Sequence, residues 1–210
     1  MQAWAEISYD KLMDAEILQT IVFKLIVPTE EEVKTLGDKL DLSKSDLNAC
    51  YCKPLINPWS GEDQSWFDVK LTVQGEHDLP PQKEWFYIVA ESGKHFKACF
   101  SGKKTKKLIS LEGNEEIGLA TKGALLEREM VYPVYYTYAD PERRGIVTKE
   151  TLEAYGGSEV FLKKTNITRE DRRGKKRDIW LISFPYELIF PVEEWQRLME
   201  EHIRANPESK

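Results

Sequence analysis

Short runs of β-branched and aromatic residues, separated by turn residues, fill the middle of this 210-residue chain. The runs lie at residues 66–73, 85–90, 95–100 and 107–111. In the first run, polar Asp68 and Lys70 alternate with apolar Val69 and Leu71, as in a strand with one buried face. The connections are short and contain glycine, which favours antiparallel pairing. We therefore expect an antiparallel sheet.

Two more apolar runs, at 160–162 and 179–184, are joined by the polar stretch 164–178. The pattern predicts two antiparallel strands with a long basic loop between them. A further β-branched run at 20–27 and an aromatic run at 131–138 predict two more strands.

Helices are indicated by caps and by spacing. Thr29 precedes three glutamates that suit the first turn of a helix, and Thr148 precedes a helix at 149–155 that Gly156 ends. Helices are also predicted near 9–18, 43–49 and 115–130, and at 192–204, where apolar residues recur at helical spacing. The fold expected is one α+β domain over 1–210, an antiparallel sheet with helices packed on one face and a protruding basic hairpin loop. A sub-division near 58–64 is the alternative.

Cysteine content and hydropathy indicate the compartment. Cys50, Cys52 and Cys99 are an odd number, and the first two are too close in sequence for an unstrained bridge, so reduced thiols are expected. No apolar run is long enough to cross a bilayer, and the first residues do not resemble a signal peptide. These features predict a cytoplasmic protein without membrane contact.

Positive charge is concentrated in two stretches of a chain whose net charge is −6. Residues 94–107 contain six lysines and no acid, and residues 163–177 contain eight cations against Glu170 and Asp171. Separation of charge on this scale is typical of a protein that binds a phosphate-bearing partner.

The second stretch carries the functional prediction, because arginine forks grip phosphate oxygens. We expect a non-enzymatic, nucleic-acid-binding accessory protein without a cofactor, and DNA and RNA are both left open. The first alternative is an adaptor whose basic arm docks an acidic protein partner. The cations expected to contact phosphate are Arg169, Arg172, Arg173, Lys175, Lys176 and Arg177, extended by Lys103, Lys104, Lys106 and Lys107.

The sequence also contains residues for two other kinds of site, a Mg²⁺-dependent nuclease site and a zinc site. Asp68 and Lys70 form a D-x-K pair like that of Mg²⁺-dependent nucleases, for which an acid upstream, Asp63, Glu62 or Asp46, would supply another ligand. Four residues have the right types for a zinc site: Cys50, Cys52, His95 and Cys99. If His95 and Cys99 lie on one strand, however, they are about 13 Å apart, too far to share an ion.

Overall fold

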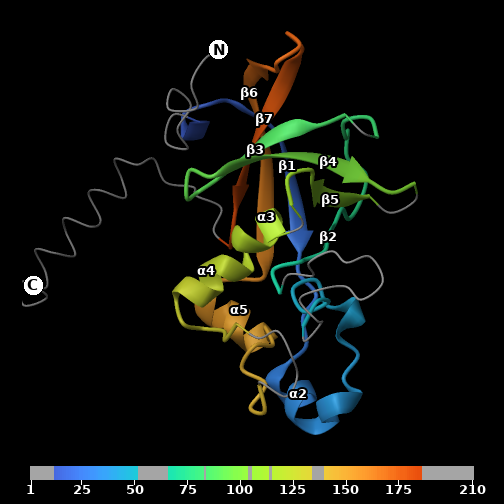
Figure 1. Cartoon of the computed structure of the whole chain (residues 1–210), viewed down its shortest axis with the longest axis vertical. Helices are drawn as coiled ribbons and strands as arrows, with labels where there is room; N and C mark the ends of the chain where they lie inside the picture. Colours follow the sequence, from blue (N-terminus) through green and yellow to red (C-terminus); the bar gives the residue numbers. More distant parts are fainter. Residues whose placement is uncertain are drawn as a thin grey trace, which may run out of the picture.

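A computed structural model gives the fold as one seven-stranded sheet with helices. It describes residues 12–51, 66–82, 84–103, 106–113, 115–133 and 140–185. The strand order is β1-β6-β7-β3-β4-β5-β2, and every neighbouring pair is antiparallel except β3 and β7 (Figure 1). The predicted α+β class is confirmed. Within the described ranges, no helix has the length and apolar character needed to span a bilayer.

The elements have the following bounds. The strands are β1 (Ile17–Lys24), β2 (Leu71–Thr72), β3 (Phe86–Ala90), β4 (His95–Ser101), β5 (Lys107–Ser110), β6 (Glu159–Glu170) and β7 (Lys176–Ser183). The α-helices are α2 (Glu30–Leu36), α3 (Glu115–Leu119), α4 (Lys122–Glu127) and α5 (Lys149–Tyr155), and the 3₁₀ turns are η2 (Gly37–Lys39) and η3 (Leu42–Lys44).

The β6–β7 hairpin is inserted between β1 and β3, and β7 runs parallel to β3. The prediction of a purely antiparallel sheet is therefore wrong at this one pair. Between β5 and β6 the chain passes through α3, α4 and α5. A connection of that length allows the hairpin to dock with β7 in the same direction as β3.

The loop predicted at 164–178 is much shorter in the structure. β6 continues to Glu170 and β7 begins at Lys176, so five residues connect the strands. β-branched residues favour the extended backbone here, and the Thr165 hydroxyl donates a hydrogen bond of 2.8 Å to the carbonyl of Ile179. This contact lies where the β6–β7 register shifts, between Lys164 and Thr168.

Two other predicted elements are shorter than expected. Only Leu71–Thr72 of the run 66–73 is a strand, since the Lys70 amide donates to the Asp46 carbonyl instead of a neighbouring strand. The helix predicted at 115–130 is divided into α3 and α4, and the Thr121 hydroxyl donates to the carbonyl of Ile117 at the break. Residues 17 and 18, predicted to end a helix, begin β1.

Apolar side chains cover both faces of the sheet. One face contributes Phe86, Ile88, Trp180 and Ile182 to a large cluster, which α3, α4 and α5 join through buried residues of their own: Ile117, Leu125 and Leu152. The opposite face has a smaller cluster of Leu12, Tyr87, Val89, Ile179 and Leu181. The α3–α5 segment therefore packs on a single face.

The turn at Trp66 and Phe67 lies tightly against α3 and α4. A Cβ atom on Gly118 would lie 1.6 Å from the Phe67 carbonyl oxygen, so only glycine fits there. The Lys122 side chain is 0% exposed; its Nζ donates to the Trp66 carbonyl at 2.7 Å and lies 3.6 Å from the centre of the Trp66 ring. A lysine thus forms part of the core.

Several predictions fall outside the described residues. They are the strand positions 134–138, the helix at 192–204, the first residues of the helix at 9–18, and the sub-division near 58–64.

Candidate nucleic-acid interface

The β6–β7 turn and the β4–β5 turn lie at the same end of the sheet. Lys176, the first residue of β7, pairs with Glu170, and β7 runs parallel to β3. β4 is antiparallel to β3, so the end of β4 at Ser101 lies beside the start of β3. In the strand order, only β3 lies between β7 and β4. In Figure 1 the β6–β7 turn is at the top and β4 ends at the right, because the sheet twists.

The β6–β7 turn is organised by the carboxylate of Asp171. Its Oδ1 accepts hydrogen bonds from the amides of Arg173 (2.8 Å) and Lys175 (3.0 Å), and its Oδ2 accepts from Arg177 Nε at 2.9 Å. The Gly174 amide donates to the Asp171 carbonyl, and Gly174 has a φ of 77°. A β-turn closed by a left-handed glycine matches the twist of the two strands. The turn therefore has a defined shape.

Burial alone would raise the pKa of Asp171, but the amides of Lys175 and Arg173, together with Arg177, hold it below its ordinary value of 3.8. A folded-state pKa below the unfolded one means that this carboxylate stabilises the turn above pH 3.8 and loses that effect as the pH falls through the folded-state value.

We expect acidification from about pH 5 to pH 2 to shift the Lys175 amide resonance in NMR spectra and to speed its hydrogen exchange. The matched variant Asp171→Asn has no titrating group at this position and should lose this transition. A wild-type Lys175 amide that is unaffected over the same range would contradict the proposed role of Asp171.

Three cations of the predicted site are used to hold the hairpin against β3. The Arg177 guanidinium lies 4.2 Å from the centre of the Trp85 ring, and its side chain is 12% exposed. Arg169 lies 5.8 Å from the centre of the Tyr87 ring. Lys175 Nζ is 2.6 Å from Glu84 Oε1, and this contact lowers the pKa of Glu84. Lys175 and Arg177 are therefore paired with acids of the protein itself.

Arg172, Arg173 and Lys176 are exposed, and none of them forms an ion pair with another described residue. At the neighbouring turn, Lys103 and Lys107 are exposed and Lys106 is half-buried. No acid in the described ranges pairs with these lysines either. Lys104 lies outside the described residues. Each turn therefore carries positive charge that is not paired with a described acid, and we call these residues, which lie at the same end of the strands, the basic end: Arg172, Arg173, Lys176, Lys103, Lys106 and Lys107.

The remaining lysines of the first basic stretch do not belong to the basic end. Lys94 lies in the β3–β4 turn at the opposite end of the sheet, and its Nζ is 2.8 Å from Glu116 Oε2. Lys97 Nζ is 3.1 Å from Glu112 Oε1. The stretch is continuous in sequence but divided in space, because β4 carries its two halves to opposite ends.

The residues predicted for a nuclease site and for a zinc site lie in different surroundings. Lys70 Nζ donates to the Ser43 carbonyl at 2.9 Å, and Asp68 is half-buried. Cys50 is half-buried, Cys99 is buried, and Cys52 lies outside the described residues. Burial and the nearby Arg169 lower the pKa of His95. Among the residues that the structure describes, no three acidic, histidine or cysteine side chains are grouped to hold a metal ion.

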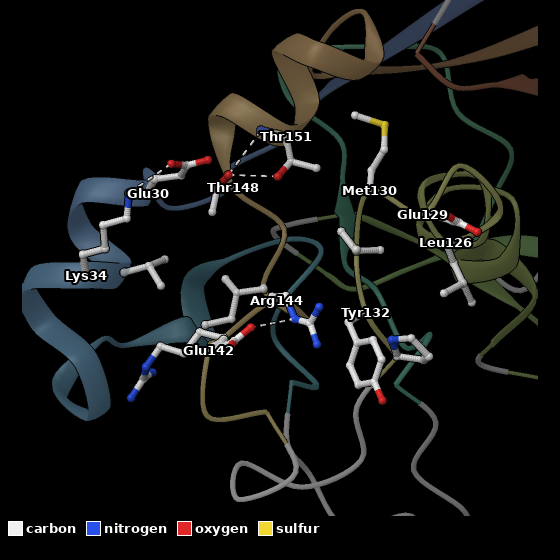
Figure 2. A pocket seen from close by; sticks show the side chains of 15 residues that line it. Glu30, Lys34, Leu126, Glu129, Met130, Tyr132, Glu142, Arg144, Thr148 and Thr151 are labelled. Atoms are coloured by element: carbon white, nitrogen blue, oxygen red, sulfur yellow. Dashed lines mark hydrogen bonds and ion pairs between the residues drawn. The ribbon is translucent and has the colours of Figure 1, made fainter.

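A cleft of about 640 Å³ lies between α2, the end of α4 and the turn at 142–146 (Figure 2). Its wall includes apolar Val33, Leu126 and Met130. Two ion pairs lie along its rim, each within one segment: Lys34 lies 3.3 Å from Glu30, and Arg144 lies 3.2 Å from Glu142. No sequence pattern predicted this cleft, since its walls come from segments about 100 residues apart.

No protein-family model matches the chain, and no curated protein is similar to it in sequence. The function is therefore inferred from the geometry and charge of the described residues.

Proposed function

We propose that the protein binds the phosphate backbone of a nucleic acid at the basic end, with the β6–β7 hairpin acting as a short basic arm. The observation that supports this most strongly is that some residues of the turn hold it in place while its other cations stay exposed. Asp171 fixes the turn and Arg177 anchors it to Trp85, while Arg172, Arg173 and Lys176 stay exposed. Cations held on an ordered turn lose less conformational freedom when they bind.

The chemistry of the basic end suits phosphate contacts. Arginine offers paired donors to phosphate oxygens, and each cation that neutralises a phosphate releases condensed counterions. Lys103, Lys106 and Lys107 add positive charge on the β4–β5 turn, at the same end of the strands. The chain as a whole has a net charge of −6, so nucleic acid is repelled from most other surfaces.

Replacement of Arg172, Arg173 and Lys176 together by alanine tests the proposal. These side chains are exposed, so the triple variant should fold with nearly unchanged stability. We expect weaker binding in fluorescence anisotropy titrations and a log–log salt slope about 3 smaller in magnitude, since three phosphate contacts are lost.

The matched control replaces Lys34, Lys44 and Lys149 by alanine. These lysines are equally exposed, belong to α2, η3 and α5, and change the net charge by the same amount. Figure 1 places α2 and α5 at the end of the molecule opposite the β6–β7 turn. Equal effects of the two triple variants would contradict a local phosphate site. Failure of the wild type to bind any nucleic acid would instead point to an acidic protein as the partner of the arm.

A further inference from the structure

Of the two aromatic rings next to the β6–β7 turn, Tyr87 is buried and Trp85 is half-buried with cations near its ring. Tyr87 is 8% exposed, and its ring meets the Trp85 ring edge-on at 5.1 Å. Trp85 in turn has Arg177 at 4.2 Å and Lys97 at 5.7 Å from its ring centre. Proteins that bind single strands stack successive bases on open aromatic rings. The described rings beside the two turns offer no such platform.

The cations of the basic end are carried by a shape that fits a groove. The β6–β7 hairpin is a two-stranded ribbon, and Arg172 and Arg173 occupy its turn. The major groove of B-form DNA is about 12 Å wide and admits a two-stranded ribbon. The major groove of A-form RNA is deep and narrow and excludes side chains carried on such an element.

We infer that the nucleic acid is double-stranded B-form DNA, with the β6–β7 turn in the major groove. This inference rests on the proposed function and adds to it the class of nucleic acid. The contacts are with phosphates, so they select the form of the helix and carry little base sequence information.

The test uses the full chain with three labelled probes of one sequence: duplex DNA, its single strand, and the duplex RNA. We expect duplex DNA to bind roughly tenfold tighter than either of the others, with the steepest salt dependence, because duplex DNA releases more counterion per contact than a single strand. Bound protein should also shield guanine N7, which lies in the major groove, from methylation by dimethyl sulfate.

The triple-alanine variant of Arg172, Arg173 and Lys176 distinguishes failure of the duplex DNA inference from failure of the proposed function. If the single strand or the duplex RNA binds as tightly as duplex DNA, and the triple variant weakens that binding, the duplex DNA inference is overturned and the proposed function stands. If guanine N7 is methylated as fast in the complex as in free DNA, the groove placement is overturned. If no probe binds, or the triple variant binds like the wild type, the proposed function itself fails.

Discussion

Gly118→Ala is expected to lower the free energy of unfolding by about 3 kcal/mol or more, the largest effect of any single methyl group in the described chain. The added Cβ would lie 1.6 Å from the Phe67 carbonyl oxygen. The obstacle is backbone, so relief requires α3 and the turn at Phe67 to move apart. Both pack in the main core through Ile117 and Trp66, and separation would loosen that packing.

The matched control is Gly123→Ala in α4, where the nearest atom to the new Cβ is the side-chain Cδ2 of Leu119 at 3.8 Å. Alanine fits there and favours the helix, so we expect the free energy of unfolding to rise by roughly 0.5–1 kcal/mol. Urea unfolding followed by circular dichroism measures both variants. Equal stability of Gly118→Ala and Gly123→Ala would contradict the close approach of α3 to Phe67.

Asp140→Ala is expected to lower the free energy of unfolding by about 3 kcal/mol, because it removes the acceptor of three hydrogen bonds, one of them from the buried amide of Gly145. The Asp140 side chain is buried, with the residue 3% exposed, and its oxygens accept from the amides of Arg144 (2.8 Å) and Gly145 (2.6 Å) and from the Tyr51 hydroxyl (3.0 Å). These bonds, with the pair between Asn48 and the backbone of Val147, join the segment at 45–51 to the turn at 140–148.

Two milder variants at the same site are expected to lower the free energy of unfolding by less. Asp140→Asn keeps one acceptor oxygen, so it should be less destabilising than alanine, and Tyr51→Phe removes one donor and should cost about 1 kcal/mol. Unfolding free energies in the order Tyr51→Phe, Asp140→Asn and Asp140→Ala, from most to least stable, are expected. An Asp140→Ala variant as stable as Tyr51→Phe would contradict a buried network centred on the carboxylate.

The elements that the sequence predicted best have their signals within a few residues. α5 has the predicted bounds because Thr148 caps it and Gly156 ends it. α2 begins after Thr29 with a capping box completed by Glu32. Caps of this kind satisfy local backbone donors, so they act before any distant contact forms. β3, β4 and β5 likewise lie within one or two residues of the predicted runs.

Features that depend on distant segments were not predictable. The parallel pairing of β3 and β7 joins residues about 90 positions apart, and no local pattern specifies it. The narrow space at Phe67 forces glycine at 118, but a glycine in a helical pattern signals only a weak helix. Lys122 reads as a surface residue, yet the Trp66 carbonyl and ring make its burial tolerable.

The sequence predicted which cations the candidate site contains, but not which of them remain exposed. The sequence named the cations of the hairpin, but it could not show that Arg177 meets Asp171 and Trp85 or that Lys175 meets Glu84. Those contacts follow from the register of β6, β7 and β3, which the sequence alone does not fix. The same register brings Lys103 to the hairpin end and takes Lys94 to the other.

The central claim is a phosphate-binding surface at one end of the sheet, and the salt dependence of nucleic-acid binding tests it most directly. Fluorescence anisotropy of labelled duplex DNA with the wild-type protein, titrated at several salt concentrations, gives the slope of log affinity against log salt. Six available cations predict a slope near −5, or about a thousandfold loss of affinity between 50 and 200 mM salt. A flat dependence, or no binding at the lowest salt, would contradict the claim.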